Sequence, residues 1–120
     1  MVKICKDGFT ACPLNEHRDI YNITYTQNIL SGRYKNLIIW FLKDEGKRYI
    51  DIKGFLNGIA QGSLTKQLRE LEEDGVVNRH VFPEVPPRVE YTLTDKGKAL
   101  VTIIEMLEQF GSQYSIQHNE

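Results

Sequence analysis

Residues 61–93 constrain the fold of this 120-residue chain more than any other segment. They begin with Leu64, Leu68 and Leu71, whose i, i+4 and i+7 spacing predicts a helix with one apolar face packed on a core. Such a helix turns its opposite face to solvent, and the side chains there are small, donor-rich or cationic: Gly62, Ser63, Thr65, Lys66 and Arg69. This face suits the major groove of DNA, and a merely solvated surface is the alternative interpretation.

The charges along this predicted helix are uneven. Positions 61–69 hold Lys66 and Arg69 and no acid, whereas four acids crowd the other end: Glu70, Glu72, Glu73 and Asp74. Acids in a last turn oppose the helix macrodipole at a cost of about 0.3–1 kcal/mol each, so helix stability alone does not account for the arrangement. The N-terminal half is therefore the part that favours a phosphate. Ala60 is a weak N-cap for this helix.

A hairpin is predicted after Gly75. Two β-prone runs, residues 76–82 and 89–93, flank the sequence PEVPPR, and the second run alternates apolar and polar side chains. Each proline fixes φ and keeps its predecessor out of the helical region, so the tip is extended and stiff. The pattern predicts a hairpin that buries one face and projects a rigid tip.

A short amphipathic helix is predicted before the long one. Tyr49, Ile52, Phe55 and Leu56 give its apolar spacing, and Asn57-Gly58 ends it. A short helix, a glycine-containing turn and a second helix are the parts of a helix-turn-helix motif. With the hairpin that follows, the order is that of a winged helix-turn-helix.

Two further helices are expected before this motif. Residues 24–30 give a moderate helical pattern closed by Ser31-Gly32, and a second helix begins near Arg33. The second helix contains the apolar run 37–42, which predicts burial at the centre of the domain. The aromatic residues Trp40, Phe41, Tyr49 and Phe55 are interpreted as core, not as a platform for stacking bases.

The last helix is predicted from the N-cap Thr94 through Phe110. Its apolar residues exceed a single stripe, so it needs a second burying surface, and a twofold dimer supplies one economically. A helix covered only by its own chain is the alternative. The residues expected at the dimer interface are Tyr25, Ile29, Leu100, Ile103, Ile104, Leu107 and Phe110.

The composition is that of an ordinary soluble domain, with 41% hydrophobic and 26% charged residues. Six consecutive apolar residues form the longest such run, far short of the roughly 20 that span a membrane, and the first nine residues do not resemble a signal peptide. We therefore expect a cytoplasmic protein. The net charge of −1 argues against a nonspecific nucleic-acid coat. Residues 33–53 nevertheless carry six cationic side chains and three acids, a local balance of +3, and no Lys or Arg follows Lys98.

Three segments together resemble the HxlR-type regulators, a winged-helix family close to MarR. They are residues 29–35 (ILSGRYK), 64–75 (LTKQLRELEEDG) and 82–91 (FPEVPPRVEY), and the similarity covers about residues 21–111. The resemblance implies a homodimeric bacterial transcription factor with the helix from Gln61 in the major groove and the hairpin beside the backbone or minor groove. Many members have tryptophan where Tyr34 stands here.

The cysteines are the second departure from the family. Some members sense oxidants or electrophiles with a Cys-Pro pair thirteen residues before the tryptophan position; here that position holds Tyr21-Asn22, and Cys12-Pro13 lies nine residues further upstream. With an insertion, Cys12 is the equivalent thiol; without one, the sensing thiol is absent. Cys5 and Cys12 match no common zinc motif. His17, His80 and His118 are scattered, so neither a metal site nor an enzyme is expected.

The sequence thus predicts an α+β, mostly helical fold: a winged helix-turn-helix with a two-stranded hairpin wing and long terminal dimerisation helices. We expect an N-terminal extension (1–20), the domain (21–111) and a C-terminal tail (112–120). The predicted DNA contacts are Gln61, Ser63, Thr65, Lys66, Arg69, Arg79 and Arg88, with Arg88 the stronger candidate in the wing because the adjacent prolines hold it.

The predicted function is a sequence-specific DNA-binding regulator that acts as a homodimer on a roughly palindromic operator. One alternative is a redox- or electrophile-responsive regulator that uses Cys12 or Cys5. Another is a winged-helix adaptor that binds a protein partner and no DNA. No cofactor is expected; the partners are double-stranded DNA, a second copy of the chain and an unidentified small-molecule effector, whose pocket would lie between the terminal helices.

Overall fold

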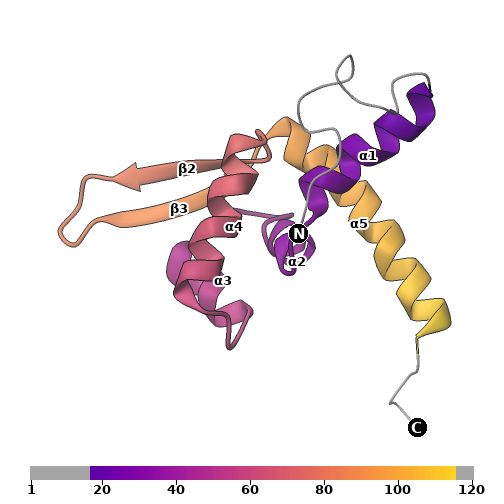
Figure 1. Ribbon diagram of the computed structural model, residues 1–120. Coiled ribbons are helices and arrows are strands. Elements are labelled where there is room, and N and C mark those ends of the chain that lie inside the picture. Colours follow the sequence, from indigo (N-terminus) through magenta and orange to yellow (C-terminus); the bar gives the residue numbers. More distant parts are fainter. Residues whose placement is uncertain (1–16, 116–120) are drawn as a thin grey trace, which may run out of the picture.

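The computed structural model describes residues 17–115 of the chain. Within that range it has five helices and three short strands (Figure 1). The helices are α1 (Arg18–Leu30), α2 (Lys35–Phe41), α3 (Tyr49–Phe55), α4 (Gln61–Glu73) and α5 (Asp95–Tyr114). The strands are β1 (Lys47–Arg48), β2 (Val77–Phe82) and β3 (Arg88–Leu93). The predicted winged helix-turn-helix is confirmed, with α3 and α4 as its two helices.

The sheet is antiparallel with the strand order β1-β3-β2. The hairpin of β2 and β3 pairs Val77 with Leu93 at its base and Phe82 with Arg88 near its tip, as a two-stranded wing requires. The sequence did not predict β1, which adds to β3 by pairing Lys47 with Tyr91. This strand fixes the start of α3 against the base of the wing.

The leucine stripe of α4 is buried as predicted. Leu64, Leu68 and Leu71 are at most 1% exposed and join the core that every helix and the hairpin share. In α2, Ile38 and Ile39 are fully buried, but Leu37 is 48% exposed, so this helix is buried on one side and not around its circumference. Apolar side chains at neighbouring helical positions face different ways, and the core covers only some of them.

Two other predictions need correction. Phe55 is 43% exposed and not a core residue; its ring stacks on that of Phe41 with centroids 4.2 Å apart, while Trp40, Phe41 and Tyr49 pack partly buried against the core. The first helix begins at Arg18, six residues before the expected start, and α5 continues one turn past Phe110.

Tight turns precede both α4 and α5 and determine where each of these helices begins. Asn57 and Gly58 have φ of +25° and +100° in the turn between α3 and α4, a conformation that glycine adopts without strain. Thr94 caps α5 by accepting a hydrogen bond from the Gly97 amide (3.0 Å), and its hydroxyl donates to the Gly75 carbonyl (2.6 Å). A Cβ on Gly97 would lie 2.2 Å from the Val76 carbonyl oxygen, so this contact requires glycine.

None of the helices in the described part of the chain is both long and apolar enough to cross a membrane.

Candidate nucleic-acid interface

The solvent face of α4 is the centre of the candidate interface. Gln61, Gly62, Lys66 and Arg69 are exposed along it, and no acidic side chain interrupts them before Glu70. The outermost line of this face is therefore an amide, a bare backbone position and two cations. These groups can donate to base edges and phosphates without first breaking a bond within the helix.

Ser63 and Thr65 lie at the two edges of this face, half-buried. The Thr65 hydroxyl is 3.2 Å from the Tyr49 hydroxyl of α3, and the Ser63 hydroxyl accepts a hydrogen bond from the Gln67 amide at 3.2 Å. Both hydroxyls are thus held by neighbouring side chains, each with acceptor capacity to spare. They lie beside the outermost line of α4, where Lys66 and Arg69 project further.

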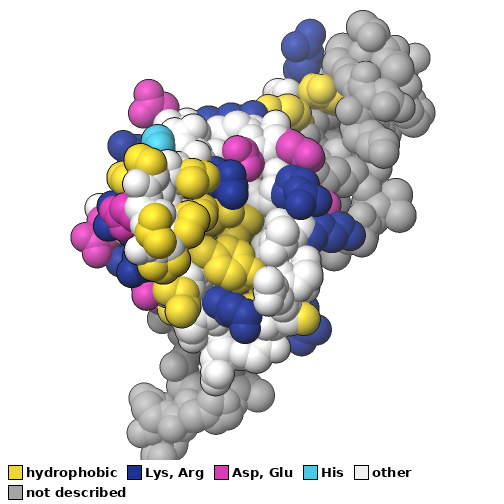
Figure 2. Space-filling view, turned by 90° about the vertical axis from the view of Figure 1, so that its left-hand side faces the viewer, with side chains coloured by type: hydrophobic (Ala, Val, Ile, Leu, Met, Phe, Trp, Pro, Cys, Tyr) yellow, Lys and Arg dark blue, Asp and Glu magenta, His cyan; other side chains and the backbone are white. Residues whose placement is uncertain are grey.

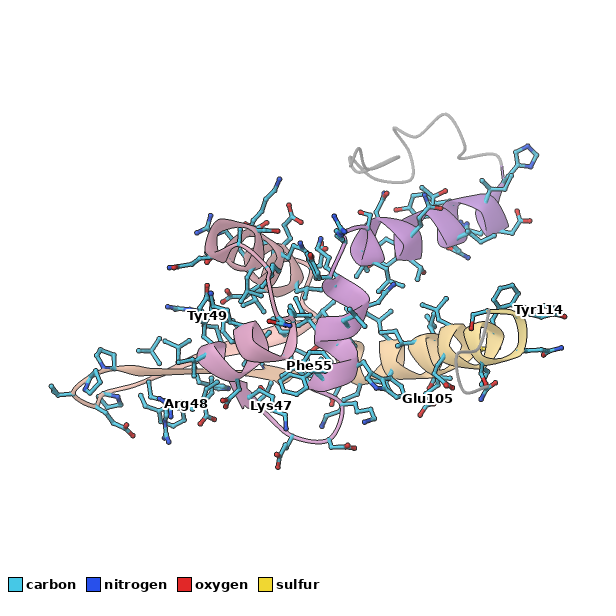
Figure 3. The ribbon with its side chains drawn as sticks, turned by 90° about the horizontal axis from the view of Figure 1, so that it is seen from below. Lys47, Arg48, Tyr49, Phe55, Glu105 and Tyr114 are labelled. Atoms are coloured by element: carbon cyan, nitrogen blue, oxygen red, sulfur yellow. The ribbon has the colours of Figure 1, made fainter. Side chains whose placement is uncertain are left out.

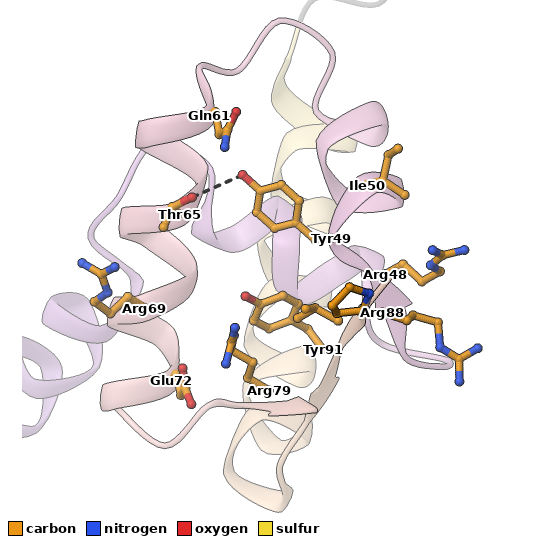
Figure 4. A pocket seen from close by; sticks show the side chains of 12 residues that line it. Arg48, Tyr49, Ile50, Gln61, Thr65, Arg69, Glu72, Arg79, Arg88 and Tyr91 are labelled. Carbon is orange, nitrogen blue, oxygen red and sulfur yellow. Dashed lines mark hydrogen bonds between the residues drawn. The ribbon is translucent and has the colours of Figure 1, made fainter. Parts of the chain in front are cut away.

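A groove of about 630 Å³ separates α4 from the wing (Figure 4). It brings together five of the seven predicted DNA contacts, three from α4 and two from the wing: Gln61, Thr65, Arg69, Arg79 and Arg88. The lining also includes Arg48, which is not among the predicted contacts, and Tyr49, which the sequence pattern assigned to the core. Arg48 is exposed at the end of β1, and its position became visible only once β1 paired with the wing.

Arg79 and Tyr91 face each other across the hairpin at the base of this groove (Figure 4). Burial raises the pKa of the Tyr91 phenol above its ordinary value, and a hydrogen bond from Arg79 acts in the opposite direction. The phenol is therefore neutral at physiological pH and orients the Arg79 guanidinium. Glu72 lines the same groove and is the acid that a bound phosphate would have to avoid.

Arg88 is held by its own hairpin. Its guanidinium lies 3.3 Å from a Glu84 carboxylate oxygen and 3.6 Å from one of Glu90, and it stacks 4.0 Å from the centroid of the Phe82 ring. The two carboxylates offset its charge, so insertion into a minor groove would first have to break these contacts. Figure 2 looks onto this wing and shows hydrophobic side chains gathered there among Lys and Arg; Val81 and Val85 are exposed members of the hairpin.

A smaller groove of about 320 Å³ lies beside α4, lined by residues of the α1–α2 turn and of α4: Ser31, Gly32, Arg33, Ser63, Lys66, Gln67 and Glu70. It holds the other two predicted contacts, Ser63 and Lys66. Gln67 accepts a hydrogen bond from the Tyr34 amide at 2.9 Å, and fully buried Lys35 pairs with Glu70 at 2.7 Å. These two links attach the start of α2 to α4.

The terminal helices carry most of the exposed apolar surface. Both α1 and α5 extend away from the wing (Figures 1 and 3), and they hold eight of the thirteen large hydrophobic side chains that are exposed in the described residues. Five of the eight form one stripe along α5: Ile103, Met106, Leu107, Phe110 and Tyr114. A stripe of this kind marks an interaction surface.

The residues expected at the dimer interface fall into two groups. Tyr25, Ile103, Leu107 and Phe110 are exposed, between 37% and 67%. Ile29, Leu100 and Ile104 are at most 7% exposed because they pack into the chain's own core, which leaves them no surface for a partner. The Tyr25 hydroxyl accepts a hydrogen bond from Lys96 at 2.7 Å, which joins α1 to the start of α5. Cys5 and Cys12 lie outside the described residues.

Comparison with known proteins agrees with this architecture. The family model for the HxlR-like helix-turn-helix matches residues 29–119. An uncharacterised HTH-type transcriptional regulator from Methanothermobacter thermautotrophicus is 38% identical over 94% of this chain and 86% of its own length.

Solved structures are similar as well, as the identity, coverage and TM-score of two of them show. The redox regulator HypR in its oxidised form has 34% identity and a TM-score of 0.75, over 80% of this chain and 99% of that one. The reduced form of the regulator YodB from Bacillus subtilis has 35% identity and a TM-score of 0.64, over 87% and 94%.

The order of elements, the wing and these similarities lead to one assignment. The chain belongs to the HxlR-like helix-turn-helix family and is a DNA-binding transcriptional regulator.

Proposed function

We propose that the protein binds a roughly palindromic operator as a homodimer, with α4 of each subunit in a major groove and the wing beside the backbone. The observation that supports this most is the exposed face of α4 over residues 61–69, which carries Lys66 and Arg69 and no acid, together with an arginine-lined groove between α4 and the wing. Lys66 and Arg69 supply phosphate and base contacts, and Gln61 supplies an amide for base readout. The protein acts by binding, in the cytoplasm, and not as an enzyme.

The dimer in this proposal forms through the apolar stripe of α5 together with the exposed residues of α1. Burial of that stripe against a twofold copy removes the largest group of exposed hydrophobic side chains from water. A twofold pair would place the two recognition helices at half-sites about 34–36 Å apart along one side of the duplex. On the wing side of α4, Arg48 of β1 and Arg79 of β2 are the cations available for the DNA backbone, because Glu84 and Glu90 hold Arg88.

Fluorescence anisotropy with DNA from upstream of the protein's own and neighbouring genes tests the proposal. We expect a preference of roughly a thousandfold or more over scrambled duplex. Lys66→Ala should weaken binding to all sequences and reduce the salt slope by about one for each subunit bound. Arg69→Glu should abolish binding while the dimer stays intact. Lys98→Glu makes the same charge change on exposed α5 and is the matched control.

The same experiment separates this function from that of a protein-binding adaptor. An adaptor would bind DNA weakly, without sequence preference, and Lys98→Glu would affect that binding as much as Arg69→Glu does. Equal effects of the two variants would therefore contradict the placement of α4 in the major groove.

Redox control of DNA binding is a second candidate, favoured by the similarity to the redox regulator HypR. In this version the thiol of Cys12 or Cys5 and a second cysteine thiol together lose two electrons and two protons to an oxidant such as diamide, and the disulfide that joins them changes the affinity for the operator. Treatment with diamide, followed by dithiothreitol, should then change the affinity reversibly. Replacement of both thiols, Cys5→Ser with Cys12→Ser, should remove the response; an unchanged response in that variant, or none in the natural protein, would exclude the cysteines as sensors.

A further inference from the structure

The small groove on the α1–α2 side of α4 contains a cation that the recognition helix does not supply. Arg33 lies in the turn between α1 and α2, is exposed, and lines this groove together with Lys66 of α4. None of the ion pairs found among the described residues joins a carboxylate to Arg33. Its guanidinium lies 5.7 Å from the centroid of the neighbouring Tyr34 ring, which restricts its direction without offsetting its charge.

We propose that Arg33 binds a DNA phosphate, and that this turn is a second backbone anchor on the side of α4 opposite the wing. The inference rests on the proposed entry of α4 into the major groove. A helix in that groove lies between two phosphate backbones, one on each side. The arginines of the wing-side groove approach one of them, and Arg33 with Lys66 approaches the other.

The turn that carries Arg33 is attached to α4 at the residue that follows Arg33. The Tyr34 amide donates to the Gln67 side chain at 2.9 Å, and that side chain in turn donates to Ser63 at 3.2 Å. The Gln67 side chain is only 8% exposed, so it cannot turn away to solvent. The backbone that follows Arg33 is therefore fixed relative to the helix that enters the groove, and only the Arg33 side chain has to be ordered when a phosphate binds.

A buried lysine balances the negative charge of Glu70, the one acid that lines this groove. Glu70 lines the groove and is 30% exposed, and it pairs at 2.7 Å with Lys35, whose side chain is completely buried. The groove lining has Arg33 and Lys66 against Glu70, and the buried Lys35 behind it brings the local charge balance to +2. A carboxylate that would otherwise repel a phosphate thus takes part in a pair, and the net attraction comes from Arg33 and Lys66.

The test is a salt series of fluorescence anisotropy with the full chain on a mixed-sequence duplex of about 30 base pairs, long enough for two half-sites one helical turn apart. A mixed sequence suffices because phosphate contacts do not depend on sequence. Arg33→Ala should reduce the salt slope by about one for each subunit bound, and Arg33→Lys should keep the slope because it keeps the charge. Lys98→Ala removes one exposed charge from α5 and should leave the slope unchanged.

Lys66→Ala in the same series distinguishes the failure of this inference from that of the proposed function. If Lys66→Ala lowers the slope and Arg33→Ala does not, Arg33 is no phosphate anchor and the inference is overturned, whereas the role of α4 stands. If the natural protein shows no salt-dependent binding, the proposed function and this inference both fail. Melting temperatures of the Arg33 variants show whether the turn is intact, and Arg33→Gln, which keeps most of the stem, replaces Arg33→Ala if that variant is unfolded.

Discussion

Leu107→Glu is expected to convert the proposed dimer into a monomer and to lower the affinity for operator DNA by about a hundredfold or more. Leu107 is 49% exposed at the centre of the apolar stripe on α5, so the single chain tolerates the change. In a twofold dimer two carboxylates would enter one apolar contact, where an unpaired charge is strongly unfavourable. The loss of affinity follows because two linked half-site contacts typically exceed one by about 10²–10⁴.

Sedimentation equilibrium gives the oligomeric state, and anisotropy on the operator gives the affinity. Gln109→Glu is the matched control, because it adds the same charge to an exposed position of α5 that lies on another side of the helix from Leu107. We expect Gln109→Glu to remain dimeric. A dimeric Leu107→Glu variant with an unchanged melting temperature would place the subunit contact elsewhere, and a natural protein that is monomeric at micromolar concentration would exclude this interface.

The central motif could be predicted from the sequence because each of its parts has a strong local cause. The spacing of Leu64, Leu68 and Leu71 defines the buried side of α4 and thereby its exposed side. The prolines of the tip and the alternation in β3 define the wing. These signals depend on neighbours within a few residues, so they survive without knowledge of the tertiary structure.

The parts that were missed depend on contacts between distant segments. The two residues of β1 carry no pattern of their own, and they form a strand only because β3 lies beside them. Gly46 marks that approach, since a Cβ there would lie 2.7 Å from a Thr92 methyl carbon. Periodicity likewise shows that a helix face must be buried, but it does not show whether the same chain or a partner buries it. Sequence alone therefore places Ile29, Leu100 and Ile104 at a dimer interface, whereas they pack into the core of their own chain.

At the candidate interface, the sequence likewise could not show which cationic side chains are available for DNA. Arg88 was the stronger sequence candidate because of its prolines, yet two carboxylates of the hairpin hold it, whereas Arg33 and Arg48 face grooves beside α4. Sequence gives the number of cations in a segment, and only the fold gives the carboxylate next to each one. Lys35, counted among the basic residues of the middle segment, is in fact enclosed by the protein.

Replacing Lys35 by methionine is the change we expect to affect both stability and DNA binding. The Lys35 side chain packs closely over Gly32, since a Cβ there would lie 2.9 Å from its methylene carbons. Methionine preserves an unbranched stem of similar length for this packing, but it removes the ammonium group that pairs with Glu70. Breaking a fully buried pair costs about 3–5 kcal/mol; Glu70 can still reach water, so we expect a loss of roughly 1–3 kcal/mol in the free energy of unfolding. The Glu70 carboxylate, without the Lys35 ammonium beside it, would also repel DNA from the small groove.

Urea unfolding and DNA anisotropy measure the two effects, and a double-mutant cycle separates them. Glu70→Gln removes the carboxylate charge that the Lys35 ammonium balances, so the double variant should be more stable than Lys35→Met alone and should bind DNA more tightly than it does. If Lys35→Met is as stable as the natural protein, the pair contributes nothing to folding. If the stability of Lys35→Met falls but Glu70→Gln does not restore DNA affinity, Lys35 contributes to folding alone. Neutralisation of Glu70 would then not be the reason that this side of α4 tolerates a phosphate.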